Sequence, residues 1–343
     1  MRDESVNIIG AGVAGLTVAA ELIEHGYNVS LYDKGTHIGA ASCSWFAGGM
    51  LAPWCERESA DEAVARLGSE AAQWWQQRTN LVENNGSLVL AQPRDANDLM
   101  RFARRTDKFE WLDGEGIKNL EPDLEGRFRK ALSFPSEAHL NPRDALAKLA
   151  NYLEDKGANF HFEQDGFDAP RADITIDARG LSASKELADL RGVKGEMLII
   201  KTDEVRLSRP VRMLHPRIPL YIVPRADGHF MVGATMIESN ERGRITARSM
   251  IELLSAAYAL HPAFGEAEIV EIGTDVRPAF SDNLPRVIKQ DGIYYLNGLY
   301  RHGFLLAPAL ARMAREAIVE NAEPELFIHK DNDDEPYRQR TSA

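Results

Sequence analysis

Three glycines near the start of the chain have the spacing of a phosphate-binding turn. They lie in the segment Gly10–Gly15, at positions 10, 12 and 15, directly after the apolar run Ser5–Ile9. Such a turn brings backbone N–H groups and a helix N-terminus against a pyrophosphate. Asp33 follows the next alternating run, where a carboxylate can accept hydrogen bonds from ribose hydroxyls. These residues predict a dinucleotide site but do not choose between NAD and FAD.

A second glycine turn, Gly298–Gly303, follows the apolar segment Gly292–Gly298. A helix beginning there would direct its N-terminal dipole at the isoalloxazine edge that becomes negative on reduction. A purely structural helix cap is the alternative for this turn taken alone. Together with the early position of the first glycine turn, this second turn favours FAD over NAD. We expect non-covalent binding, because Cys43 is more typical of a small buried side chain than of a flavin attachment.

The bulk composition excludes several other classes of protein. The chain has 343 residues and a formal charge of -12, which disfavours nucleic-acid binding but allows an anionic substrate held by a few arginines. Its two cysteines, Cys43 and Cys55, provide neither a disulfide framework nor a metal site, so no metal is expected. No signal peptide or membrane span is visible. We expect a cytoplasmic enzyme with a small-molecule substrate, no membrane partner, and self-association left open.

Hydrophobic periodicity places these motifs on strands and helices. Residues 5–9 and 27–32 read as strands around a helix that ends at Gly26. Helices are expected at 61–83, over most of 95–120, at 141–157 and from 303 to 320. Further strands are expected at 87–91, 159–162, 173–177, 197–200, 220–223, 229–232 and 292–298.

This order predicts an α/β protein of two interleaved domains. We expect a Rossmann-like FAD-binding domain made of residues 1–50, 138–190 and 272–343. The second, α+β domain would bind substrate with a mixed, largely antiparallel sheet, from residues 51–137 and 191–271.

The chain resembles the D-amino-acid oxidase family of FAD enzymes, and within it the glycine oxidases that supply thiazole formation in thiamine biosynthesis. The resemblance lies in motifs that follow the family's order along nearly the whole chain: Gly10–Gly15, Ala47–Pro53 with Glu56, Val193–Glu196, Tyr221–Gly228, Val232–Met236, Val276–Pro278 and Arg301–Pro308.

The resemblance implies roles for four side chains around the substrate. Arg277 matches the arginine that holds the substrate carboxylate, and Tyr221 matches the tyrosine that assists it; a planar guanidinium fork and a phenol donor suit a carboxylate. Arg301 matches a second arginine near flavin and substrate, and Met50 matches a residue lining the same small cavity. A structural ion pair for Arg277 and a core position for Tyr221 are the alternatives. The lone His302 is given no catalytic role.

The two glycine turns and the resemblance together imply a set of FAD contacts. They are Gly10, Gly12, Val13, Ala14, Gly15, Asp33, Lys34, Ala41, Ser42, Ala47, Gly48, Gly49, Met50, Gly180, Arg277, Arg301, His302, Gly303, Phe304 and Leu305.

Two segments depart from the family pattern. Most of the usual β-meander is missing between the strands at 159–162 and 173–176, which leaves the adenine-side contacts open. Asp282–Pro285 replaces the Asp-Gly pair of glycine oxidases with a form typical of the wider family.

The implied reaction is hydride transfer from the substrate Cα to flavin N5, giving an imine that hydrolyses to glyoxylate and ammonia or an amine. Oxygen is the expected electron acceptor, which would yield hydrogen peroxide. Orientation contributes much of the rate, and no side-chain base on Cα is required. The alternatives are a secondary amine such as sarcosine or iminodiacetate, with Arg301 or Arg225 as a second cation, another D-amino-acid oxidase or dehydrogenase, a membrane-docking dehydrogenase, and a non-catalytic dinucleotide sensor.

Overall fold

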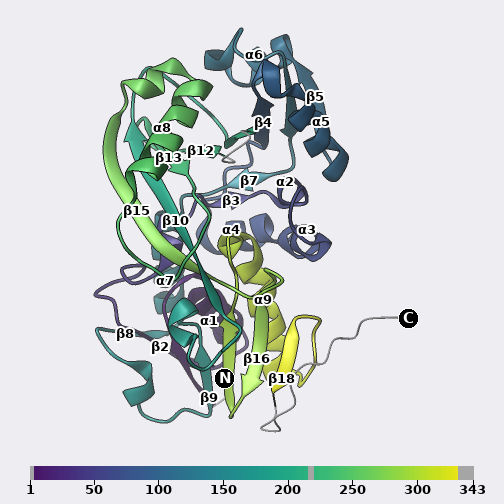
Figure 1. The fold of residues 1–343 in the computed structure, drawn as a ribbon. Coiled ribbons are helices and arrows are strands. Elements are labelled where there is room, and N and C mark those ends of the chain that lie inside the picture. Colours follow the sequence, from purple (N-terminus) through teal and green to yellow (C-terminus); the bar gives the residue numbers. More distant parts are fainter. Residues whose placement is uncertain (1–3, 215–219, 331–343) are drawn as a thin grey trace.

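Two large sheets organise the molecule. The computed structural model describes residues 4–214 and 220–330, and Figure 1 shows one sheet in the lower part of the view and the other in the upper part. The predicted domain segments at residues 1–3, 215–219 and 331–343 lie outside the described residues.

The first sheet contains the predicted N-terminal strand in its interior, between β9 and β2. Its seven strands run in the order β18-β16-β17-β9-β1-β2-β8, and all neighbours are parallel except β16 and β17. The strands are β1 (Ser5–Ile9), β2 (Asn28–Asp33), β8 (Asn159–Phe162), β9 (Ile174–Asp177), β16 (Arg286–Gln290), β17 (Ile293–Asn297) and β18 (Phe327–Lys330). The glycine turn therefore leaves the carboxyl end of a central parallel strand, where open α/β sheets bind ligands.

Helices α1 (Val13–Glu24) and α9 (Gly303–Val319) pack on this sheet, and α4 (Ala71–Thr79) and α7 (Pro142–Asp155) pack against these two helices. Helices α1 and α9 are in contact, and their leucines and alanines belong to one buried cluster. Pro142 is the first residue of α7, and the Asn141 side chain accepts a hydrogen bond from the Arg143 amide, which caps the helix. The predicted helix at 141–157 is thereby confirmed.

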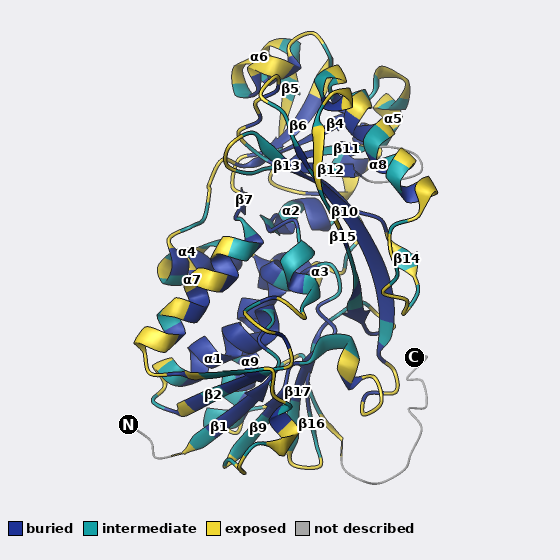
Figure 2. Cartoon of the chain, turned by 90° about the vertical axis from the view of Figure 1, so that its left-hand side faces the viewer, coloured by how far each residue is buried: buried dark blue, intermediate teal, exposed yellow. Residues whose placement is uncertain are grey.

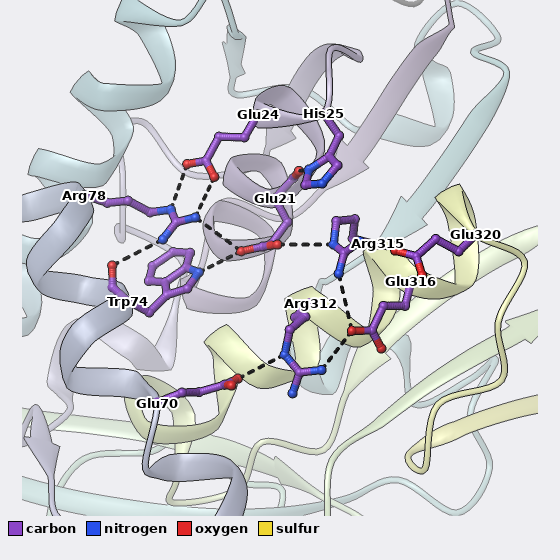
Figure 3. A network of polar contacts seen from close by, with 10 residues as sticks. All are labelled: Glu21, Glu24, His25, Glu70, Trp74, Arg78, Arg312, Arg315, Glu316 and Glu320. Carbon is purple, nitrogen blue, oxygen red and sulfur yellow. Dashed lines mark hydrogen bonds and ion pairs between the residues drawn. The ribbon is translucent and has the colours of Figure 1, made fainter.

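Polar side chains tie three of these helices together, as Figure 3 shows. The buried carboxylate of Glu21 on α1 accepts a hydrogen bond from Trp74 on α4 at 2.8 Å. It also pairs with Arg78 at 3.4 Å and with Arg315 on α9 at 3.5 Å. The outer partners are Glu24, Glu70, Arg312, Glu316 and Glu320. This network fixes α1 and α9, whose N-termini lie at the candidate site, relative to each other.

The second sheet is mixed and largely antiparallel. Its nine strands run in the order β14-β10-β13-β12-β11-β4-β6-β5, with β15 paired to β10 off this path; only β4 and β11 are parallel neighbours. They are β4 (Ser87–Ala91), β5 (Glu110–Asp113), β6 (Lys130–Phe134), β10 (Arg191–Lys201), β11 (Val211–Leu214), β12 (Leu220–Pro224), β13 (His229–Gly233), β14 (Ile237–Glu238) and β15 (Glu268–Ala279). The predicted fold class is confirmed.

Shorter elements complete the second body. Helix α8 (Ala247–Leu260) covers β10, β12 and β13, and α5 (Ala96–Arg105) and α6 (Gly114–Leu120) lie beside β4, β5 and β6. A small ribbon of β3 (Met50–Leu51) and β7 (Ala138–His139), followed by α2 (Pro53–Glu56) and α3 (Glu62–Gly68), lies between the two sheets in Figure 1.

The pair β10 and β15 connects the two bodies. The strands pair antiparallel from Arg191 opposite Ala279 to Lys201 opposite Glu268, and Figure 2 shows them running from the upper sheet toward β16 and β17. The predicted domain boundary between residues 271 and 272 falls inside β15. The boundaries themselves stay a prediction.

Several local predictions were wrong. The helix expected at 61–83 is two helices, α3 and α4, because the chain passes close to α9 at Gly68, where a Cβ would lie 2.6 Å from Leu305 Cγ. The stretch 95–120 contains strand β5 between its two helices, stabilised by pairing with β6. Strands β15, β16 and β18 were not predicted. Pairing with neighbouring strands stabilises them, and their sequences lack a strict alternation of apolar and polar residues.

Candidate active site

The N-termini of α1 and α9 face one cavity. It encloses about 1170 Å³, including space open to solvent, and lies between the first sheet and the inner end of the β10 and β15 pair. Neither Gly12 nor His302, the N-cap residues of the two helices, forms a side-chain cap hydrogen bond. The Val13 amide at the start of α1 donates instead to Ser44 Oγ at 3.2 Å. The positive ends of both helix dipoles still face the cavity, which suits it to negative charge.

The first glycine turn fits closely against its surroundings. Gly10 has a φ of 105°, and a Cβ on it would lie 2.7 Å from the Ala178 carbonyl oxygen. A Cβ on Gly15 would lie 1.9 Å from the Gly10 oxygen, and one on Gly12 would lie 2.7 Å from Ser42 Oγ. The turn thus leaves its backbone open to the cavity and permits no larger side chain at these positions.

Asp33 lies at the end of β2 beside this turn. Its Oδ2 accepts a hydrogen bond from the Ala11 amide and its Oδ1 one from the Gly35 amide, both at 2.7 Å. These bonds fix the carboxylate at the cavity wall, with lone pairs left for hydroxyl donors.

A second cavity of about 470 Å³ opens beside the first. Its lining residues are Met50, Glu56, Arg212, Tyr221, Ala234, Met236, Arg277 and Arg301. Tyr221, Arg277 and Arg301 line both cavities, so a ligand in the smaller one would meet a ligand in the larger one at these side chains. The structure thus brings together all four side chains predicted to surround the substrate.

Strand register explains how three of these side chains meet. Arg212 on β11 stands directly opposite Tyr221 on β12, which places both on one face of the sheet. Arg277 lies on β15, and its guanidinium crosses Gly195 on β10, where a Cβ would lie 2.3 Å from Nη2. Arg277 Nη1 donates to the Thr235 carbonyl at 3.1 Å, and no described residue forms an ion pair with Arg277. Its remaining donors are available to a ligand.

Glu56 is the carboxylate of the second cavity. It is buried; Arg212 Nη2 donates to its Oε1 at 2.6 Å, and Arg301 Nε donates to its Oε2 at 3.0 Å, with Arg301 Nη2 on the same oxygen. Burial alone would raise the pKa of Glu56, but Arg301 and Arg212 outweigh burial and hold it well below its usual range. Burial also lowers the pKa of His302 to about 4, despite Glu56 at 3.6 Å. At neutral pH Glu56 is therefore charged and His302 is neutral.

Most of the predicted dinucleotide contacts line the larger cavity. These are Gly10, Gly12, Val13, Ala14, Asp33, Ala41, Ser42, Ala47, Gly48, Gly180, Arg277, Arg301, Gly303 and Phe304. Lys34 lines a side pocket that shares Gly10, Asp33 and Ala41 with the larger cavity, and it pairs with Asp165 at 2.8 Å.

The other predicted contacts lie elsewhere. Gly15 supports the turn from inside, and Gly49 packs against the Leu140 carbonyl, where a Cβ would lie 2.1 Å from the oxygen. Leu305 and His302 are buried behind the wall, and Met50 lines only the smaller cavity. Arg225, weighed as a second cation for a substrate, instead donates to the Gly48 carbonyl at 2.8 Å and lines neither cavity.

The sequence analysis missed several residues of the site. Arg212 had no motif to mark it, and Glu56 was noted only as part of the family pattern. Arg179 lines both the larger cavity and the side pocket, where it pairs with Asp177 at 2.6 Å and lies over the Phe167 ring at 4.5 Å. In the sequence, only the glycine turn at Gly180 indicated this part of the larger cavity, next to the side pocket.

Comparison with known proteins gives the family. The DAO family, described as FAD dependent oxidoreductase, matches residues 5–317. The chain belongs to this family. The predicted resemblance and the predicted FAD cofactor are thus confirmed.

Members of the DAO family include close relatives of this chain. A Rhizobium etli protein named thiamine biosynthesis oxidoreductase ThiO is 56% identical over 318 residues, covering 92% of this chain and 97% of the relative. Glycine oxidase of Geobacillus kaustophilus is 26% identical, covering 93% of each chain. Its crystal structure superposes with a TM-score of 0.78, covering 94% of this chain and 96% of that one. An iminodiacetate oxidase from Chelativorans sp. BNC1 has the same fold, with a TM-score of 0.78, 24% identity and coverage of 92% and 95%.

The larger cavity fits the FAD of this DAO-family enzyme. The glycine turn, the Asp33 carboxylate and the α1 N-terminus match a pyrophosphate and ribose, and the α9 N-terminus would face the flavin ring. None of the described helices combines the length and apolar character needed to cross a membrane.

Proposed function

We propose that this DAO-family enzyme oxidises glycine or a closely related small amine, giving glyoxylate, ammonia or an amine, and hydrogen peroxide. The observation that carries the proposal is Arg277, a half-buried cation at the junction of the two cavities without an ion pair among the described residues. A small carboxylate is the ligand it fits, because the guanidinium fork matches two carboxylate oxygens. The similarity to ThiO and to glycine oxidases supports the same substrate class.

In this proposal the protein binds and orients the substrate. Arg277 and Tyr221 hold the carboxylate, which directs the Cα–H toward the larger cavity. The bound FAD supplies the acceptor for a hydride equivalent. Met50 and Met236 form an apolar part of the same wall, which suits hydrogen atoms or small apolar groups on Cα. No side-chain base is needed on Cα, because positioning at short distance replaces it.

Oxygen is proposed as the final electron acceptor because of the similarity to glycine oxidases. Thiamine biosynthesis is proposed as the pathway because the Rhizobium etli relative is a thiamine biosynthesis oxidoreductase by name. A second candidate substrate is an N-substituted glycine with another acid group, such as iminodiacetate. Arg212 favours it, because this arginine adds a further cation to the smaller cavity.

Peroxide release with glycine, sarcosine, iminodiacetate and D-alanine, measured side by side on the FAD-loaded protein, tests the proposal. Glycine or sarcosine is expected to give the highest kcat/KM. A preference for iminodiacetate would favour the second candidate. Anaerobic bleaching of the bound flavin without peroxide release in air would contradict oxygen as acceptor, and no turnover of any of the four amines would contradict the proposed function.

A further inference from the structure

Arg212 gives the smaller cavity more positive charge than a carboxylate ligand requires. Three arginines line this cavity, Arg212, Arg277 and Arg301, against one carboxylate, that of Glu56. His302 behind them is neutral at neutral pH, since burial lowers its pKa to about 4. Once a substrate carboxylate occupies Arg277, the described residues of the wall around the substrate nitrogen still carry an excess of one positive charge.

We propose that Arg212, through this excess charge, drives the substrate nitrogen from its ammonium to its amine form in the cavity. The inference rests on the proposed function. On binding, the ammonium releases one proton to bulk water and keeps its lone pair on nitrogen. That lone pair forms the C=N bond as the hydride leaves Cα for FAD, so only the amine reacts. The charge on Arg212 thereby changes the protonation state of the substrate nitrogen. Arg212 itself makes no contact with the Cα–H bond that breaks.

The alternative for Glu56 is to bind the substrate ammonium itself. Its contacts argue against this: Oε1 accepts from Arg212 at 2.6 Å, and Oε2 accepts two N–H groups of Arg301. Both oxygens are thus occupied by arginines. Arg301 is held further by Ser59 Oγ at 3.0 Å. Glu56 therefore positions the two arginines and neutralises one of them, and a net positive wall remains.

The other charged groups nearby do not reverse this balance. Arg242 and Asp275, beside Arg277, pair with each other at 3.4 Å. Glu137 lies behind α2, where its Oε1 accepts from the Cys55 amide at 2.7 Å. Burial raises the pKa of Glu137 to about 7 and that of the Cys55 thiol well above its usual value, so neither adds a full negative charge at neutral pH. Tyr221 contributes a phenol.

The pH dependence of anaerobic flavin reduction by glycine tests the inference. Arg212→Met, which keeps an unbranched stem but removes the charged guanidinium, is expected to raise the apparent pKa of the rising limb by about one pH unit. Glu56→Gln removes the one carboxylate among the described residues that line the smaller cavity and is expected to lower the apparent pKa. Arg212→Lys should stay close to wild type. Arg206→Met, the same loss of charge at an exposed site, should not shift the profile.

Opposite shifts in Arg212→Met and Glu56→Gln are the decisive result. A merely structural role predicts slower reduction in both variants with the profile unmoved, and that outcome, or shifts in the same direction, would overturn the inference. If Arg212→Met does not fold, the direction of the Glu56→Gln shift decides alone. Failure of glycine and sarcosine to reduce the flavin of the wild-type protein would instead contradict the proposed function.

A binding measurement tests proton release from the ligand nitrogen in the absence of hydride transfer. The probe is 2-aminoisobutyrate, which has no hydrogen on Cα, and isobutyrate is the control without nitrogen. Calorimetry in buffers of different ionisation enthalpy should show release of up to about one proton for the first ligand and none for the second. Arg212→Met should release less. Equal release in Arg212→Met and wild type would count against the inference.

Discussion

Two glutamates of this molecule are buried among arginines, and their surroundings differ. Glu21 lies between α1, α4 and α9, where Arg78, Arg315 and Trp74 contact it and further carboxylates neutralise the arginines (Figure 3). Glu56 lies on α2, where Arg212 and Arg301 share its two oxygens and Arg277 stands nearby without an acid partner.

The difference separates a structural charge cluster from a functional one. The Glu21 cluster closes on itself, lines neither of the two cavities, and joins helices that must stay fixed. The Glu56 cluster faces a cavity and has arginines in excess, although an uncompensated buried charge is costly for folding. An excess of one sign at a cavity wall therefore points to a ligand of the opposite sign.

The largest expected effect comes from removing the arginine that has no ion pair. Arg277→Met should lower kcat/KM for glycine roughly a thousandfold, or about 4 kcal/mol, because the substrate carboxylate loses its charged partner. The unfolding midpoint should change little, since none of the acids in residues 4–214 and 220–330 forms an ion pair with Arg277. Steady-state kinetics and thermal unfolding test this, with Arg101→Met, an exposed arginine paired with Asp98, as control. A loss of less than tenfold would contradict the role of Arg277 as the charged partner of the substrate carboxylate.

Glu21→Gln should show the reverse pattern. Removing the charge leaves Arg78 and Arg315 without their shared carboxylate, so the free energy of unfolding should fall by about 3 kcal/mol. The kcat/KM of the folded, FAD-loaded enzyme should stay near wild type. Urea unfolding compares it with Glu320→Gln, an exposed partner of Arg315, for which we expect a change within about 0.5 kcal/mol. Equal losses in both variants would contradict a central role for Glu21.

Glu137 is a third buried glutamate, and unlike Glu21 and Glu56 it has no ion pair among the described residues. Burial raises its pKa to about 7, against hydrogen bonds from Ser87 and the Cys55 amide. The folded state therefore holds a proton that the unfolded state has lost, and this contribution to stability falls as pH rises from about 5 to 7.

Glu137→Gln removes this titration. Between pH 5 and 7 the stability of wild type relative to the variant should fall by about 2 kcal/mol. Urea unfolding at pH 5, 6 and 7 provides the measurement. A difference independent of pH would show that Glu137 is charged throughout.

The smallest expected effect concerns the space beside Gly195 that the Arg277 guanidinium occupies. In Gly195→Ala the new methyl group would meet the guanidinium, so the side chain must shift away from its present position. We expect KM for glycine to rise about tenfold, equivalent to ~1.4 kcal/mol, with a smaller change in kcat. The matched control is Gly114→Ala, where, as at Gly195, the φ is not positive, and where a Cβ would meet only the Phe128 carbonyl oxygen at an ordinary 3.6 Å. An unchanged KM in Gly195→Ala would show that Arg277 has room to adapt.

Local signals sufficed for the nucleotide half of the site. The strand Ser5–Ile9, the glycine turn and Asp33 are consecutive along the chain, and β1, α1 and β2 form there as predicted. The C-terminal turn before Gly303 was likewise visible, because strand β17, the turn and α9 follow one another.

The substrate half depended on contacts distant in sequence. Arg277 and Tyr221 were proposed through the family resemblance alone, and nothing near them in the chain shows that they share a cavity. Arg212 was not predicted, because its place beside Tyr221 follows from the register of β11 against β12. The pairing of Glu56 with Arg301, residues 245 positions apart, depends on the packing of both bodies. Charge balance in a cavity becomes visible only once such contacts are known.

The sheet that surrounds β1 also has a consequence for biosynthesis. Strand β1 comes from residues 5–9, whereas β16, β17 and β18, which lie beyond β9 in the same sheet, come from residues 286–330 and are translated later. Helix α9, which packs on α1 and closes the flavin end, is made in the same late stretch. A ribosome-bound chain therefore holds an incomplete nucleotide pocket until translation has passed α9, so complete FAD binding requires both β1 and α9 to have been made.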